Sequence, residues 1–238
     1  MSSAVDFFYS DLSWECWRIR AFLNAINLRY KAVLAEFGKT LPFSVYGELP
    51  VLRHGNKIIE DHRLMLLYID ETFANYALLG SKHASRIAQL TMIEQLDEGC
   101  LKVLTALTLA DSNLFLPLYM KELCALGKYR FYRARRKSRA VTLQTRYGIS
   151  INNDQLFSRF TLSLKELSTF VGKGSVSGAV AICIVSALEM LRGENRWWKE
   201  IVNDRAVLTW LMSQTSPMIL AGVPATTVPA GTFSRTNE

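Results

Sequence analysis

The chain has 238 residues, of which 50% are hydrophobic and 21% are charged. This balance is typical of a folded protein with a substantial core, and it excludes an intrinsically disordered or collagen-like chain. The formal net charge of +7 comes from one segment, because eight basic residues and no acidic one lie between Glu122 and Asp154. The rest of the chain is nearly neutral, so the excess charge is a local feature.

The sequence predicts a cytoplasmic protein without a transmembrane segment. The longest charge-free apolar stretch, residues 174–188, is shorter than the roughly 20 residues that a membrane-spanning helix needs. The N-terminal residues include Asp6 and have no basic region ahead of an apolar run, unlike a secretory signal. The cysteines occur singly, so neither a disulfide framework nor a metal site is expected. They are Cys16, Cys100, Cys124 and Cys183.

The first 80 residues alternate between short apolar runs and helical patterns. Residues 5–9 and 30–37 predict strands, and residues 16–26 between them predict a helix. The segment His54-Gly55-Asn56 predicts a β-hairpin between strands at residues 50–53 and 57–59, because glycine and asparagine tolerate positive φ. Residues 64–73 then predict a closing helix. This order of elements favours a thioredoxin-like domain over residues 1–80.

Beyond residue 80 the strand pattern ends and the apolar residues follow a helical period. The period extends over residues 87–104 and again over 156–167, which predicts an all-helical domain over residues 81–212. The turn Gly80-Ser81-Lys82 is the expected linker. Residues 213–238 are rich in serine, threonine, proline and glycine, and they are expected to form a loosely ordered tail.

Two motifs and the domain layout resemble the cytosolic glutathione transferases. The segment Gly47-Glu48-Leu49-Pro50-Val51-Leu52 is similar to the G-x-[VL]-P-x-L segment of that family. The segment Trp17-Arg18-Ile19-Arg20 resembles the W-R-V-R of zeta-type members. The resemblance implies an α+β/α architecture, in which a thioredoxin-like domain is followed by an all-α helical bundle. It also implies a cis bond before Pro50, glutathione as co-substrate, a homodimer, and detoxification of a small electrophile.

The reaction of this family requires the thiolate of glutathione. A free thiol has a pKa of about 8.5, so it is mostly protonated at neutral pH and needs a hydroxyl donor aimed at the sulfur. Tyr9 stands eleven residues before Arg20, which resembles the position of the catalytic tyrosine in alpha-, mu-, pi- and sigma-like members. Ser13 resembles the serine of zeta- and theta-like members. Only one of the two is the donor. The competing interpretations are a packing role for Tyr9 and a helix N-cap role for Ser13.

The resemblance also implies which residues bind the rest of glutathione. The backbone of Leu49, next to Pro50, is expected to bind the cysteinyl part, and Lys39 to reach the glycyl carboxylate. Family members carry Glu-Ser or Gln-Ser where this chain has Asp61-His62. The helix N-terminus there remains an anion site, and an imidazole donates hydrogen bonds, although the bulk of His62 obstructs the glutamyl pocket. The alternative is that His62 is an exposed residue of the first helical turn.

Two further features separate the chain from the family pattern. The N-capping box S-x-x-D of many members is altered here, because Val180 follows Ser177 where the aspartate is expected. The basic run at residues 128–139 contains three aromatic residues, a composition that binds nucleic acid or an anionic membrane as readily as it forms a solvated helix face.

Two functions therefore remain open at the level of sequence. The first is a glutathione transferase that joins glutathione to a small electrophile or uses it for reduction or isomerisation, with Tyr119 and its neighbours lining the acceptor pocket. The second is a catalytically inactive, transferase-like module that binds an acidic protein, a membrane or a nucleic acid through residues 128–139.

Overall fold

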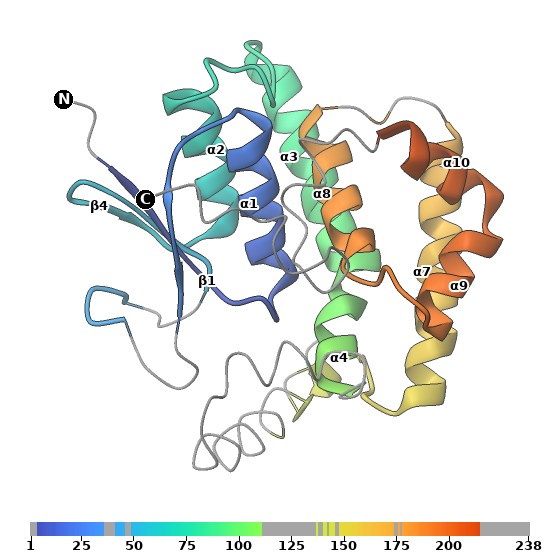
Figure 1. The fold of residues 1–238 in the computed structure, drawn as a ribbon. Helices are drawn as coiled ribbons and strands as arrows, with labels where there is room; N and C mark the ends of the chain where they lie inside the picture. The colour runs from blue at the N-terminus through green and yellow to red at the C-terminus, as the bar shows by residue number, and fades with distance from the viewer. Residues whose placement is uncertain are drawn as a thin grey trace.

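A thioredoxin-like sheet and its two helices form one side of the molecule, and a helical region forms the other (Figure 1). The computed structural model describes residues 4–35, 41–45, 49–110, 137, 140–141, 143–145, 148–173, 176 and 178–214. The N-terminal elements are β1 (Val5–Tyr9), α1 (Trp14–Ala25), β2 (Lys31–Leu34), β3 (Val51–His54), β4 (Lys57–Ile59) and α2 (His62–Thr72). They follow the order predicted from the sequence.

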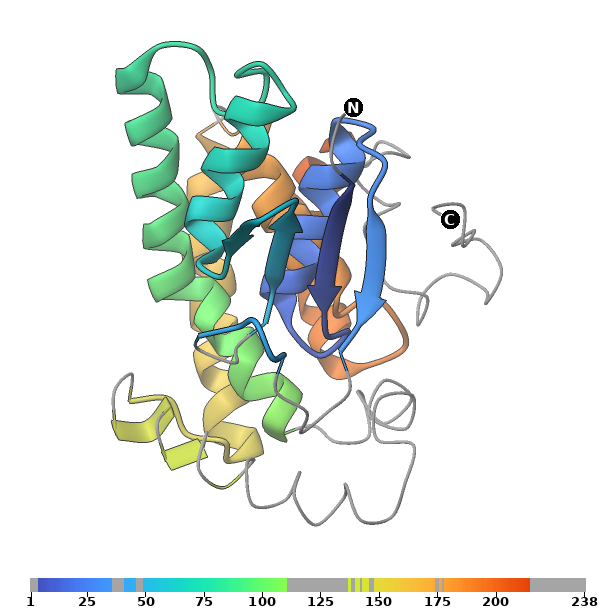
Figure 2. The same cartoon turned by 90° about the vertical axis from the view of Figure 1, so that its left-hand side faces the viewer.

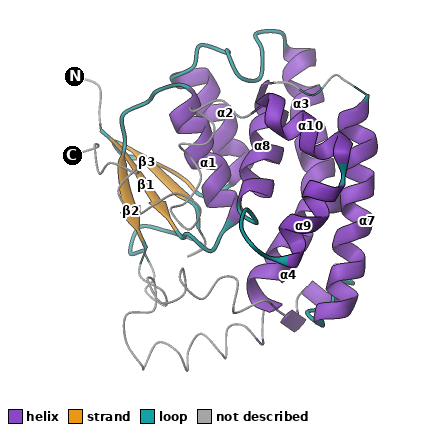
Figure 3. Cartoon of the chain, turned by 45° about the vertical axis from the view of Figure 1, so that its right-hand side comes forward, coloured by secondary structure: helices purple, strands orange, loops and turns teal. Residues whose placement is uncertain are grey.

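The sheet has the strand order β2-β1-β3-β4. β1 and β2 are parallel, and the other neighbours are antiparallel. Parallel neighbours require a crossover connection, which α1 provides. β3 and β4 form the predicted hairpin, in which Gly55 takes a positive φ of 59°. Helices α1 and α2 cover the face of the sheet that is turned toward the helical region (Figures 1 and 3).

The remaining described elements are all helical, as predicted. Figure 2 shows α3 leading through η1 into α4 as one continuous green rod. η1 is a π-helix, which the 3.6-residue period does not predict because it contains a wider turn. The elements are α3 (His83–Leu96), η1 (Asp97–Leu101), α4 (Lys102–Ala110), α7 (Asn153–Gly172), α8 (Gly178–Glu189), α9 (Arg196–Asn203) and α10 (Arg205–Gln214).

Helix α8 is the centre of the hydrophobic core. Its residues 179–189 are all buried, and it packs against α1 on one side and against α3 and α10 on others. A helix that is apolar on every face is stable only when other elements surround it. The apolar stretch seen in the sequence is thus an interior helix, and Val180 is one of its buried residues. Among the described residues, no helix is both long enough and apolar enough to span a membrane.

The first residue of α8 packs closely against the segment that joins the two regions. Gly178 has a φ of +59°, and a Cβ atom there would lie 2.9 Å from the backbone oxygen of Leu78. We expect Gly178→Ala to lower the free energy of unfolding by about 1–3 kcal/mol, because alanine is strained at positive φ. Gly172→Ala is the matched control, since a Cβ there meets no atom within 4 Å. Denaturant unfolding of both variants checks this, and equal stabilities would contradict it.

Candidate functional site

The strand register gathers the predicted site residues at one end of the sheet. β1 and β3 are antiparallel with Phe8 opposite Val51, so the loop that follows β1 lies beside the Leu49-Pro50 segment that precedes β3. β3 and β4 are antiparallel with Leu52 opposite Ile59, so β4 ends on the same side. The loop that leads to α1, the segment before β3 and the N-terminus of α2 therefore border one region.

The Leu49–Pro50 peptide bond is cis, as the resemblance implies. Pro50 is buried, and Leu49 is partly buried against the core. Lys39, Gly47 and Glu48 lie outside the described residues. The structure thus describes the part of this segment that enters β3.

Ser13 is the N-cap of α1, and its hydroxyl is engaged twice. The oxygen accepts a hydrogen bond from the backbone N–H of Cys16 at 3.3 Å. The hydroxyl proton is donated to Oε2 of Glu15 at 2.6 Å. Glu15 was missed in the sequence reasoning, although an acidic residue two positions after a serine cap is a readable signal. Ser13 therefore caps α1, and a thiol bound nearby would compete with Glu15 for the proton of its hydroxyl.

Tyr9 is surrounded by packing partners. Its ring lies parallel to that of Phe7 with centroids 5.8 Å apart, and the guanidinium of Arg20 lies 4.1 Å above it. Arg20 also pairs with the buried Asp11 at 3.4 Å. Within the described residues, no hydrogen bond reaches the Tyr9 hydroxyl. These contacts support the packing interpretation of Tyr9 over the catalytic one.

Cys16 faces the core, as expected from its position in the helix. Its side chain is 1% exposed, and its sulfur accepts the backbone N–H of Ser10 at 3.4 Å. Burial raises the pKa of the Cys16 thiol to about 12. Because the thiolate is the nucleophile, this cysteine is not a reactive group in the folded protein.

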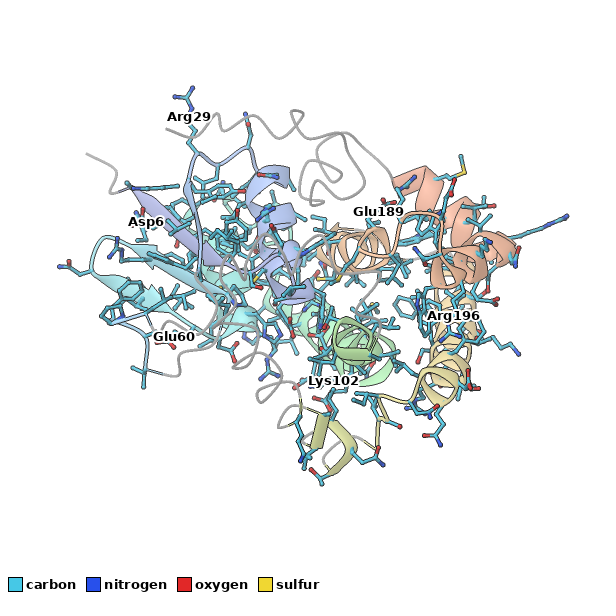
Figure 4. All side chains as sticks on the ribbon, turned by 60° about the horizontal axis from the view of Figure 1, so that its bottom comes forward. Asp6, Arg29, Glu60, Lys102, Glu189 and Arg196 are labelled. Carbon is cyan, nitrogen blue, oxygen red and sulfur yellow. The ribbon has the colours of Figure 1, made fainter. Side chains whose placement is uncertain are left out.

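The N-terminus of α2 carries its own anion. The Oδ1 atom of Asp61 accepts the backbone N–H groups of Arg63 at 2.8 Å and Leu64 at 3.0 Å. The preceding residue, Glu60, is labelled in Figure 4, and it accepts hydrogen bonds from the Ser44 hydroxyl and the Val45 backbone N–H. Two adjacent carboxylates thus lie at the N-terminus of α2, which makes this region less favourable for an anion.

His62 points toward the helical region. Its Nε2 atom lies 3.3 Å from Oδ2 of Asp97 in η1, and its side chain is 29% exposed. His62 is therefore not a free side chain of the first helical turn, because it contacts Asp97 and so connects α2 to η1. A histidine at this position was predicted as part of the binding site, but its partner was not.

Asp97 forms a buried ion pair with Arg18 of α1. The two side chains make a bidentate contact of 2.8 and 2.5 Å, and the Arg18 side chain is 0% exposed. Burial opposes ionisation of Asp97, but the hydrogen bond and charge of Arg18 outweigh it and hold the pKa of this carboxyl below its usual value. The guanidinium also lies 4.5 Å from the ring of Trp14, whose Nε1 donates to Thr105 of α4 at 2.9 Å. This network joins the thioredoxin-like domain to η1 and α4.

The described residues also line surface hollows. One is lined by residues of α3 and α7, and another by residues 148–150 and the first half of α7. Neither is lined by a predicted site residue. Tyr119 and almost all of the basic run 128–139 lie outside the described residues. Within the described part of the chain, no group of three His, Cys, Asp or Glu side chains is arranged to hold a metal ion.

Comparison with known proteins agrees with this architecture. Residues 7–77 match the family model described as glutathione S-transferase, N-terminal domain. No curated protein sequence matches the chain. Residues 7–77 are therefore similar to the N-terminal domain of glutathione S-transferases.

Solved glutathione transferases share the fold over almost the whole chain. Poplar glutathione transferase F1 is 11% identical with a TM-score of 0.64, and the alignment covers 93% of this chain and 97% of that one. A tau-class enzyme from mango is 19% identical with a TM-score of 0.59, covering 94% of each chain. A glutathione S-transferase from Methylobacillus flagellatus, solved with glutathione bound, is 15% identical with a TM-score of 0.63, covering 93% and 100%.

Proposed function

We propose that this protein binds glutathione at the end of the sheet bordered by α1, the Leu49-Pro50 segment and α2, and transfers it to a small electrophile. The observation that carries the proposal is the match of residues 7–77 to the glutathione S-transferase N-terminal domain. The strand register supports it, because it brings the three predicted binding segments to one end of the sheet. In this proposal Leu49 binds the cysteinyl backbone, and Lys39 binds the glycyl carboxylate.

Ser13 is the better supported thiol donor of the two candidates. It stands at the N-terminus of α1, where the helix dipole favours a thiolate, whereas the ring of Tyr9 is held between Phe7 and Arg20. The proposal extends to a homodimer in the cytoplasm, with a domain boundary near residue 80. These features rest on the family resemblance.

The second candidate is an inactive binding module. Two observations favour it: the Ser13 hydroxyl is donated to Glu15, and the N-terminus of α2 is capped by the carboxylate of Asp61. Both features weaken the binding and ionisation of glutathione. An anionic partner would then bind the basic run 128–139, which the structure does not describe.

Calorimetric titration with reduced glutathione at neutral pH separates the two functions. Saturable binding at micromolar to low millimolar affinity is expected for the enzyme. The absence of heat at several millimolar glutathione would overturn the proposal and direct attention to the basic run.

The charge of Asp61 gives a sharper form of the same experiment. We expect Asp61→Asn to bind glutathione about fivefold more tightly, because it removes a like charge near the glutamyl carboxylate, an effect of about 1 kcal/mol. Asparagine keeps the helix cap, since its carbonyl oxygen accepts the same N–H groups. The control is Asp154→Asn, which makes the same change of net charge at a side chain that is 97% exposed and belongs to α7. Equal affinities for both variants would contradict the placement of the glutamyl end at α2.

A further inference from the structure

Glu15 controls the proton that a transferase of the serine type would use. The Ser13 hydroxyl has one proton, and it is donated to Glu15 Oε2 at 2.6 Å. The Ser13 oxygen also accepts the N–H of Cys16 at 3.3 Å. To stabilise a thiolate, the hydroxyl must donate to sulfur, so it must first leave Glu15.

We propose that Glu15 is a positioning residue that holds the Ser13 hydroxyl away from the thiol and opposes an anion at the N-terminus of α1. In the unliganded protein the site is therefore kept in a state that disfavours the thiolate. The effect on bound glutathione rests on the proposed function. The effect of the Glu15 charge on an anion at the N-terminus of α1 does not depend on glutathione.

The cations of α1 offset the charge of Glu15 only in part. Arg18 interacts electrostatically with Glu15, but its guanidinium forms an ion pair with Asp97, and Arg20 pairs with Asp11. Within the described residues, no ion pair is formed by Glu15. The side chain is also only partly exposed, so solvent screens its charge incompletely. The same charge is among the causes that raise the pKa of the neighbouring Cys16 thiol, after burial.

The first test measures the pKa of the glutathione thiol in the complex, by the ultraviolet absorbance of the thiolate as a function of pH. Glu15→Ala removes both the charge and the acceptor, and it is expected to raise the thiolate fraction at neutral pH about tenfold. Glu15→Gln removes the charge but keeps an amide oxygen that accepts the Ser13 proton, so a smaller increase is expected.

A double-mutant cycle isolates the hydroxyl. In the presence of Glu15, Ser13→Ala is expected to raise the thiol pKa of bound glutathione only slightly, because the hydroxyl is donated mainly to Glu15. In the Glu15→Ala background, Ser13→Ala is expected to return the pKa to the value of the Glu15→Gln variant. An equal effect of Ser13→Ala in both backgrounds would overturn the proposed role of Glu15. Loss of the N-cap alone changes stability and not this pKa, so a purely structural role is distinguished.

The second test needs no glutathione. Ser13→Cys places a reporter thiol at the hydroxyl position, and its alkylation by iodoacetamide is followed against pH by tandem mass spectrometry, which separates it from Cys16 in the same peptide. Adding Glu15→Ala is expected to increase the rate at pH 7 about tenfold, and adding Glu15→Gln nearly as much, since here the charge is the cause.

The two tests separate the failure of the inference from the failure of the proposed function. An unchanged pH profile of the reporter in the Glu15→Ala background would overturn the inference whether or not glutathione binds. A shifted profile together with no glutathione binding would support the role of Glu15 as an anion-repelling residue and overturn the transferase function. Circular dichroism of each variant confirms that it is folded.

Discussion

Replacing Asp97 by asparagine is expected to lower the free energy of unfolding by about 3–5 kcal/mol, because it leaves the Arg18 guanidinium buried without its counter-charge. Arg18 is fully buried, and its guanidinium also lies over the ring of Trp14. Among the described residues, Asp97 is the one carboxylate that forms an ion pair with Arg18. Denaturant unfolding measures the change, and the corresponding loss of Tm is about 10 °C for a chain of this size.

The matched control lies one turn earlier on the same rod of helices. Glu94 of α3 also pairs with an arginine of the N-terminal domain, Arg63, but both side chains are about half exposed. Glu94→Gln is therefore expected to cost less than about 1 kcal/mol. A similarly small cost for Asp97→Asn would show that Arg18 is readily solvated, and it would contradict the role assigned to the buried pair.

The lowered pKa of Asp97 gives the same pair a pH dependence. A carboxyl whose pKa is depressed on folding contributes stability above its unfolded value, near 3.8, and this contribution is lost as the pH falls through the folded pKa. The free energy of unfolding should therefore fall more steeply below pH 4 in the natural protein than in the Asp97→Asn variant.

The elements of the N-terminal domain were predictable because each is encoded locally. Each element has a short-range signal in the sequence. The signals are the apolar residues of β1, the glycine of the hairpin and the helical period of α2. The helix starts differed from the prediction by two residues, since these helices begin at Trp14 and His62, directly after the N-caps Ser13 and Asp61. Cap geometry fixes such boundaries, and periodicity does not.

The contacts that decide the chemistry were not predictable, because they join distant residues. Arg18 and Asp97 are 79 positions apart, and Asp97 lies in a π-helix that the helical period does not indicate. The bond between Ser13 and Glu15 is local, but it depends on which of several rotamers Glu15 adopts. A sequence pattern identifies the residue types at a site, whereas the partner that each polar group chooses follows from packing.

The three carboxylates near the proposed site act in the same direction. Glu15 stands beside the thiol donor, and Glu60 and Asp61 stand at the N-terminus of α2. Each raises the free energy of a nearby anion. A transferase with this arrangement binds glutathione weakly and ionises it poorly until a carboxylate moves or is neutralised. Thus the same observations that favour the inactive module also identify the substitutions expected to strengthen glutathione binding under the proposed function.

The thiols of Cys16 and Cys183 are expected to resist alkylation in the folded protein. Both are fully buried, and burial raises the pKa of each to about 12 from 9.0. At pH 8 the thiolate fraction of each is therefore about a thousandfold lower than that of an unfolded cysteine. Labelling with iodoacetamide at pH 8, followed by peptide mass spectrometry, should modify these two cysteines only after urea is added.

The sign of this shift also predicts an alkaline loss of stability. A thiol whose pKa is raised on folding stays neutral in the folded state while the unfolded state ionises, so its contribution is complete below pH 9 and is lost as the pH rises toward 12. The free energy of unfolding should fall by up to about 1.4 kcal/mol per pH unit for each thiol. Cys16→Ala and Cys183→Ala should each remove one such contribution from the slope. Rapid labelling of Cys16 in the native protein at pH 8 would contradict its burial and the raised pKa of its thiol.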